Sequence, residues 1–446
     1  MNKALSPFDA VSFLIDKAKK FGADAAESFG VFSTSASADC RFQKTESLEY
    51  TQTAAVDLRV FSGKRQAVAA SSVLDEQTLT DLAKRAVEMA KAVPEDPFCG
   101  LADPAQQATD FPDLDLYDST KISTEKLLET ALKAEDAALN VKGVTNSDGA
   151  GASFEKSDVL IASTTGFSRR YQRSSCAFSV SVIAGTEAKE TDYDYSSAVY
   201  FSDLEAPEKI GKQAGERAVK RLGAQKIESG VMDVVFEPRL SRGFVGVLAS
   251  AINGSAIARG TSFLKDSLND IVLNPALSLI EDPFVKRGAA SRACDSEGLP
   301  CVKRAIVDSG RLTTWLLDLR SARQLGLAPT GHGARGLGGT AHPAPSNLFL
   351  TGGAAAPAEL FADIKRGLYI TQLFGQGINL ITGDYSRGAS GFLIENGKIT
   401  TPVSEITVAG NLKDMLKSMQ AANDIGDRHA VNAPTVRLNG LSIAGK

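Results

Sequence analysis

Helix patterns flank strand patterns twice in the first half of the chain, and this order restricts the fold more than any single motif. Apolar residues recur at helical spacing over 8–18 and 79–90, and the residues between these helices alternate as strands do. Residues 62–64, Ser-Gly-Lys, are typical of a hairpin turn between two such strands. A second round of helix, strands and helix follows over 121–222. The order predicts an α+β unit duplicated in layout, although residue identity between the two halves is weak.

A connector separates the two rounds. Residues at about 94–118 contain four prolines and many acids, a composition that favours an extended segment over another helix or strand. We therefore predict an N-terminal α+β domain over 1–225, with a mixed sheet and flanking helices.

The second half of the chain is richer in strand patterns. A buried strand at 231–238 leads into a helix of small residues, and hairpin signals follow at 308–310 and 395–398. These patterns predict a β-rich C-terminal domain over 226–446, which we expect to contain a cleft. The predicted fold class is α+β.

Composition excludes several classes of partner. The net charge of −4 favours neither nucleic acid nor an anionic membrane surface. No apolar run approaches the length of a membrane span, and Asp9 and Asp16 interrupt the first apolar segment, so we expect no signal peptide. The five scattered cysteines indicate reduced thiols, and the expected location is the cytoplasm.

A glycine- and proline-rich segment runs over 329–345. Its GHGARG matches G-x-G-x-x-G, but neither a strand before it nor a helix after it frames the match, which argues against a dinucleotide site. We expect this loop to line a cleft, where glycine allows close approach of an extended peptide. His332 and His342 would then hydrogen-bond backbone or substrate. Two alternatives stay open: an ordered loop without a ligand, and a metal site completed by Cys294, Cys301 or Asp295.

Other candidates for chemistry are few. The chain contains no H-E-x-x-H and no G-x-S-x-G, and it has three histidines in all. Asp295 and Glu297 could act as acid and base, or they could be surface acids at a turn. Arg259, Arg335 and Arg387 are candidates for contacts with peptide carbonyls or carboxylates, with a helix cap or solvated loop charge as the alternative.

An ordered set of motifs gives the chain a family resemblance. The segments RGTSF, CDSEGLP, LGLAPTGHG…TAHPAPSNLFL and FLIENGKITTPVSEITVAGNL resemble the TldD/PmbA peptidase family. This family pairs two related subunits. The TldD type carries zinc on a helix written H-E-x-x-x-H, with a third ligand near the LIENGK segment, and the PmbA (TldE) type lacks these ligands.

The residues at the corresponding positions place this chain with the type that lacks zinc. Leu248, Ala249 and Asn253 stand where the helical ligands should be, and Gly388 stands near the third-ligand position. A catalytic zinc takes imidazole, thiolate or carboxylate ligands, which these residues do not supply. The resemblance therefore implies no catalytic residue, no metal and no cofactor in this chain.

The resemblance also implies a function. We expect a non-catalytic subunit of a cytoplasmic zinc metallopeptidase complex that processes or degrades small unfolded peptides, with the zinc in a TldD-like partner. The family also bears the name modulator of DNA gyrase. Two alternatives remain: a stand-alone homodimeric peptidase or hydrolase with an unorthodox site, and a peptide-binding module without hydrolytic activity. The missing histidines and glutamate argue against chemistry by this chain alone.

Overall fold

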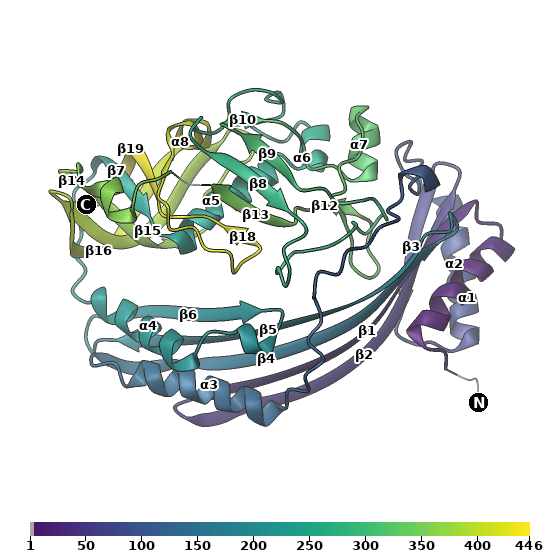
Figure 1. The fold of residues 1–446 in the computed structure, drawn as a ribbon, viewed down its shortest axis with the longest axis horizontal. Helices are drawn as coiled ribbons and strands as arrows, with labels where there is room; N and C mark the ends of the chain where they lie inside the picture. The colour runs from purple at the N-terminus through teal and green to yellow at the C-terminus, as the bar shows by residue number, and fades with distance from the viewer. Residues whose placement is uncertain (1–3, 352) are drawn as a thin grey trace.

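The computed structural model describes residues 4–351 and 353–446. A long, strongly curved sheet forms the N-terminal half, and its convex side carries the helices of that half (Figure 1). The C-terminal half lies over the concave side, and the connector passes between the two (Figure 1). The α+β class predicted from the sequence is confirmed.

Two similar halves build the N-terminal sheet. Its strands lie in the order β3-β2-β1-β4-β5-β6. Their bounds are β1 Ala25–Arg41, β2 Lys44–Ser62, β3 Arg65–Ser71, β4 Val144–Ser163, β5 Ser168–Ala184 and β6 Glu190–Ala198. The helices are α1 Pro7–Lys20, α2 Glu76–Ala92, α3 Thr124–Leu139 and α4 Pro207–Lys220. The halves α1-β1-β2-β3-α2 and α3-β4-β5-β6-α4 meet at the β1–β4 pair, so the layout is duplicated within one sheet.

The sheet is antiparallel at every pairing, and the expectation of a mixed sheet was wrong. Within each half, short turns join consecutive strands, and such turns can only connect antiparallel neighbours. Between the halves, the equivalent first strands β1 and β4 also pair antiparallel.

Two separate hydrophobic clusters hold the helices to the convex side. Leu14 of α1 and Leu82 of α2 belong to the cluster at one end, and Leu127 of α3 and Ile210 of α4 belong to that at the other. The helices α3 and α4 approach closely at Gly211, where an added Cβ would lie 2.0 Å from the carbonyl oxygen of Ala134. None of these four α-helices lies on the concave side (Figure 1).

Two sheets form the C-terminal half. The first has the order β16-β15-β14-β7-β19-β17, and β16 also pairs with β19, so this sheet closes on itself. Its strands are β7 Gly230–Phe236, β14 Arg366–Phe374, β15 Asp384–Glu395, β16 Lys398–Asn411, β17 Gln420–Ala421 and β19 Val436–Ala444. The second has the order β10-β9-β8-β13-β18. Its strands are β8 Ser278–Asp282, β9 Arg304–Asp308, β10 Arg311–Leu312, β13 Asn347–Thr351 and β18 Val431–Asn432.

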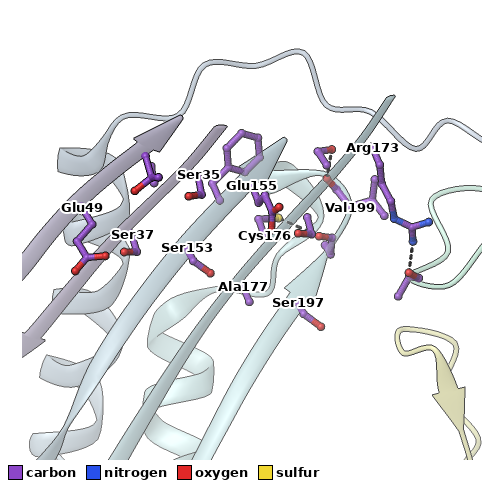
Figure 2. A pocket seen from close by; sticks show the side chains of 17 residues that line it. Ser35, Ser37, Glu49, Ser153, Glu155, Arg173, Cys176, Ala177, Ser197 and Val199 are labelled. Atoms are coloured by element: carbon purple, nitrogen blue, oxygen red, sulfur yellow. Dashed lines mark hydrogen bonds between the residues drawn. The ribbon is translucent and has the colours of Figure 1, made fainter. Parts of the chain in front are cut away.

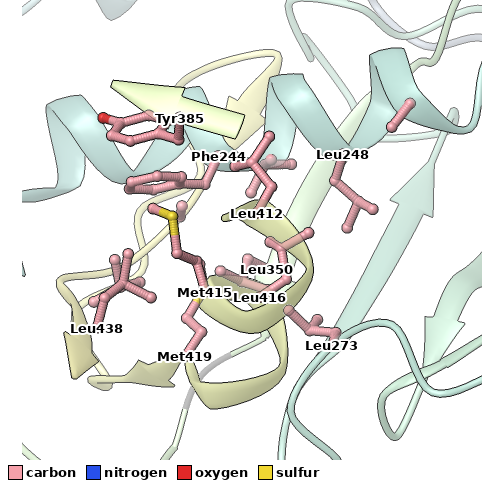
Figure 3. Packing of buried hydrophobic residues seen from close by; sticks show 14 of the residues in the cluster. Phe244, Leu248, Leu273, Leu350, Tyr385, Leu412, Met415, Leu416, Met419 and Leu438 are labelled. Carbon is pink, nitrogen blue, oxygen red and sulfur yellow. The ribbon is translucent and has the colours of Figure 1, made fainter. Parts of the chain in front are cut away.

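Short helices and one small hairpin complete this half. They are α5 Pro238–Ala251, α6 Gly254–Ala258, α7 Leu319–Leu325, α8 Leu412–Ser418, and the hairpin of β11 Gly333–Ala334 and β12 His342–Pro343. The 3-10 helices of the described residues are η1 Pro104–Gln106, η2 Phe201–Asp203 and η3 Pro357–Phe361. The predicted helix of small residues is two helices, because the first ends at Ala251 and the side chain of Asn253 caps the start of the second. Helices α5 and α8 pack in the large core through Phe244, Leu248 and Met415 (Figure 3).

Two predicted hairpins of this half are confirmed. The turn between β15 and β16 has Asn396 and Gly397 at φ of 50° and 74°, the conformation that the Asn-Gly pair favours. Ser309 and Gly310 form the turn between β9 and β10.

Within the part of the chain that the structure describes, no helix combines the length and apolarity needed to span a membrane. All five cysteines are free and buried.

Candidate functional site

Part of the concave face of the N-terminal sheet is lined with small hydroxylated side chains, and an apolar cluster that includes Phe29 and Ile161 lies elsewhere on this face. A cavity of about 300 Å³ lies on this face, and its wall includes Ser35 and Ser37 of β1, Ser153 of β4 and Ser197 of β6 (Figure 2). Alternation along each strand sends the apolar partners to the opposite face, where Phe154 packs beneath α3 and α4. The sequence therefore builds one apolar and one hydroxylated face from the same strands.

Strand register arranges the hydroxylated side chains in rows across the sheet, with two glutamates and one alanine among them. One row consists of Thr51, Ser35, Glu155 and Ser175, which are cross-strand partners. The next row consists of Glu49, Ser37, Ser153, Ala177 and Ser197. Hydroxyls both donate and accept hydrogen bonds, so such a face can bind peptide groups of any sequence. We call it the hydroxylated face.

This face lacks an activated nucleophile. None of the described residues that line the cavity is a histidine, so no imidazole there can take a proton from a serine. Burial raises the pKa of the Cys176 thiol to about 12, and its Sγ donates to the carbonyl oxygen of Ala198. The geometry suits binding better than covalent chemistry.

The glycine-rich segment joins the two halves through Arg335, which follows strand β11. Its Nη1 donates to Glu27 Oε1 at 2.6 Å, and its Nη2 donates to Asp57 Oδ1. Arg59 donates to the same oxygen of Glu27 at 2.8 Å, and the amide of Gly338 donates to Asp57. Burial alone would lower the pKa of Arg335, but the two carboxylates outweigh burial and raise it. Arg335 is thus buried between the halves, and its contacts correct the expectation that it faces a substrate.

His332 is also buried, with an exposed fraction of 1%. Its Nε2 lies 2.8 Å from Glu281 Oε2, and its Nδ1 lies 2.7 Å from the hydroxyl of Thr330. Burial lowers the pKa of this imidazole, so the neutral ring can donate to Glu281 and accept from Thr330. Both ring nitrogens are occupied by the protein itself. The structure therefore places His332 away from any open surface.

The remaining cleft candidates do not converge. His342 is exposed on β12, Arg259 is exposed after α6, and Arg387 is half-buried on β15. The Nε of Arg387 is buried without a hydrogen-bond partner.

The structure does not support the alternative of a metal site that includes His332 and His342. Among the residues that the structure describes, no three histidine, cysteine or acidic side chains are grouped to hold a metal ion. Cys301 lies with its Sγ 3.5 Å from the carbonyl oxygen of Gly331.

Asp295 and Glu297 are not surface acids. They are 2% and 9% exposed. Asp295 accepts from the backbone amides of Glu297, Leu299 and Gly333, and Glu297 accepts from the amide of Leu319 at 2.7 Å. Burial raises the pKa of Asp295 to about 6, and burial together with the charge of Asp295 raises the pKa of Glu297 well above its ordinary value. The pair fixes the CDSEGLP turn against β11 and α7.

Comparison with known proteins agrees with the fold and the motifs. Family models described as PmbA/TldA metallopeptidase domain 1, central domain and C-terminal domain match residues 26–90, 117–222 and 229–445. The chain belongs to the PmbA/TldD family.

Its relatives identify the type. A metalloprotease PmbA homolog of Haemophilus influenzae is 37% identical over 98% of this chain and 95% of the relative. Metalloprotease PmbA of Escherichia coli O157:H7 is 35% identical over 98% of this chain and 96% of the relative. The TldD homolog of the same Haemophilus strain is 26% identical over 53% of this chain and 48% of its own. The chain is of the PmbA (TldE) type.

Solved structures share the fold. A Bacteroides thetaiotaomicron protein described as a modulator of DNA gyrase superposes with a TM-score of 0.90 at 27% identity, covering 98% of this chain and 99% of that one. TldE from Thermococcus kodakarensis has a TM-score of 0.87 at 18% identity, covering 98% and 100%, and shows likeness of fold.

The residues that the resemblance matches to zinc ligands do not fit a zinc ion in this PmbA-type chain. Leu248 is 2% exposed and points into the hydrophobic core (Figure 3), and Ala249 carries only a methyl group. The amide of Asn253 is already used, since it donates to the carbonyl oxygen of Pro343 and accepts from the amide of Ser255. Gly388 has no side chain. None of the four supplies an imidazole, thiolate or carboxylate.

Sequence reasoning missed the hydroxylated face and the carboxylate partners of Arg335. The alternating serines at 33, 35 and 37 were a readable signal for the face, because alternation sends all three to one side of the strand. Nothing local in the sequence marks Glu27 and Asp57, since their partner lies about 300 positions further along the chain.

Replacing Arg335 with methionine should destabilise the protein strongly. The change leaves Asp57 buried without its cation and Glu27 with Arg59 alone, at a cost of about 3–5 kcal/mol in the free energy of unfolding. Arg320→Met is the matched control, because Arg320 also joins the halves, through an exposed ion pair with Asp96 at 2.7 Å worth about 0–1 kcal/mol. Urea unfolding of both variants measures the difference. Equal loss in the two variants would contradict the role given to Arg335.

Glu297→Gln should change how stability depends on pH. Because the folded pKa of Glu297 lies above its ordinary value of 4.5, the unfolded chain releases this proton first. The wild type therefore loses stability from this group as pH rises above 4.5 towards the folded pKa, and does not regain it at higher pH. The glutamine variant should lack this pH-dependent loss of stability. Its free energy of unfolding should therefore rise relative to that of the wild type between about pH 5 and pH 8, and urea unfolding midpoints at these two values measure the change. Glu95 is exposed, so Glu95→Gln should show the same dependence of stability on pH as the wild type. The same dependence in Glu297→Gln would contradict the role given to Glu297.

Proposed function

We propose that this chain is the non-catalytic subunit of a peptidase complex that processes or degrades small unfolded peptides. Its zinc would be held by a TldD-like partner. The observation that carries the proposal is the state of Leu248, Ala249, Asn253 and Gly388, whose side chains offer a metal no free ligand. The name metalloprotease borne by the PmbA relatives supports the peptidase class.

The hydroxylated face supports a role in holding peptide. An extended peptide exposes one amide and one carbonyl per residue, and these groups need partners whatever the side chains are. Rows of serine and threonine hydroxyls supply such partners without selecting a sequence. The small side chains also leave space above the sheet, so a chain without folded structure can lie on it.

Reconstitution tests this proposal. The chain and a TldD-like subunit bearing H-E-x-x-x-H are purified separately, then mixed, and hydrolysis of an unstructured peptide is followed by mass spectrometry. Hydrolysis should require the mixture, and it should disappear when the glutamate of the partner's motif is replaced by glutamine. Zinc-dependent hydrolysis by this chain alone would contradict the proposal and favour a stand-alone enzyme.

A blocked groove provides the second arm of the test. Ser153→Trp fills the hydroxylated face and should raise the KM of the mixture severalfold, while Lys84→Trp on the convex side should leave it unchanged. If both variants behave as wild type does, the face is not where peptide lies.

A further inference from the structure

A second cavity, of about 430 Å³, continues from the hydroxylated face into the junction of the two halves. Its walls come from the connector at 112–117, from strand β5 and from residues 291–296. Arg173 lines both cavities, so the second lies next to the first along the sheet. A peptide lying on the hydroxylated face can therefore reach it.

Three arginines line this second cavity, and none of them forms an ion pair with a residue that the structure describes. Arg169 donates to the Sγ of Cys294 at 2.7 Å, Arg173 donates to the carbonyl oxygen of Ser291 at 3.0 Å, and Arg292 donates to that of Ala344. No carboxylate oxygen of the described residues lies within 4.0 Å of any of the three guanidinium groups. The Nε of Arg292 is buried without a hydrogen-bond partner.

The acids on the same wall are engaged elsewhere. Asp115 forms an ion pair with Arg287 at 2.6 Å, and Asp113 accepts from the amide of Asp115. Asp295 uses its carboxylate on three backbone amides. Burial raises the pKa of the Cys294 thiol, so this sulfur does not supply a negative charge either.

An uncompensated cluster of cations is costly in a partly buried place. Burial and the charge of Arg292 both lower the pKa of Arg173, because both disfavour its charged form. A bound anion would offset it, and guanidinium groups match a carboxylate especially well because they donate two parallel hydrogen bonds. Apolar side chains of Phe167, Leu114 and Leu116 complete the wall and would contact the rest of a peptide residue.

We propose that Arg169, Arg173 and Arg292 form a subsite for a carboxylate of the peptide that lies on the hydroxylated face. The carboxylate is the C-terminus of the peptide or an acidic side chain near it. This inference rests on the proposed function, because it assumes that the ligand in the groove is a peptide.

Three versions of one unstructured, fluorescein-labelled peptide test the subsite by fluorescence anisotropy with the full-length chain. One version ends in a free carboxylate, one in an amide, and one in an amide preceded by glutamate. The free acid should bind about tenfold more tightly than the plain amide. The third version identifies the source of the carboxylate: it binds like the acid if a side chain suffices, and like the plain amide if the C-terminus is required.

Variants of strand β5 provide the matched control. Arg169→Gln should abolish the preference for the acid, whereas Arg170→Gln should keep it, because Arg170 is exposed and pairs with Asp158 outside the cavity. The preference of the wild type should also shrink as salt rises, a readout that needs no variant.

Two results would overturn the inference. Equal affinity for all three peptides would remove the subsite and leave the proposed peptide-binding role intact. Absence of binding by every peptide, with Ser153→Trp also without effect on the mixed complex, would remove both.

Discussion

The buried contact of Arg335 with Glu27 and Asp57 is the interaction on which the arrangement of the two halves depends. It joins residues 308 and 278 positions apart in the chain, and all three side chains are buried. Such a contact is stable only when every charge is matched, and here Arg59 and the amide of Gly338 complete the set. The contact attaches the glycine-rich segment to the N-terminal sheet. Because the guanidinium has a fixed planar geometry, the contact also sets the position of this segment relative to the sheet.

The neighbouring buried polar groups continue this contact into the C-terminal half. Asp295 binds the amide of Gly333, Glu297 binds that of Leu319, and His332 binds Glu281. Glycine is required within this network: Gly331 has a φ of 74°, and a Cβ there would lie 2.4 Å from the carbonyl oxygen of Pro300. Residue types that suggest catalysis in a sequence are thus used to hold two domains around a groove. We propose the hydroxylated face as the surface for a ligand, beside three arginines that form no ion pair with a described residue.

Much of the fold could be predicted because it is written in local patterns. Apolar spacing located α1 and α2, the glycine-containing turns located the hairpins, and the repeated order of elements indicated the duplication. Long-range consequences could not be read in the same way. The antiparallel union of β1 with β4 depends on how two distant halves meet, and the burial of Asp295 and Glu297 depends on α7 and β11 closing over them. For the candidate site, the motif comparison predicts that Leu248 and Asn253 have no zinc chemistry, and this stays a prediction. The same comparison could not show that Arg335 and His332 are enclosed.

The most direct test of the account is the zinc content of the full-length chain purified alone without chelators. We predict far less than one equivalent, since the side chains at the positions that the resemblance matches to zinc ligands are apolar, absent or already hydrogen-bonded. The same chain purified with a TldD-like subunit should carry zinc that remains with that subunit when the two are separated. A full equivalent of tightly held zinc in this chain alone would contradict the account, because it would require a metal site built from residues that the structure keeps apart.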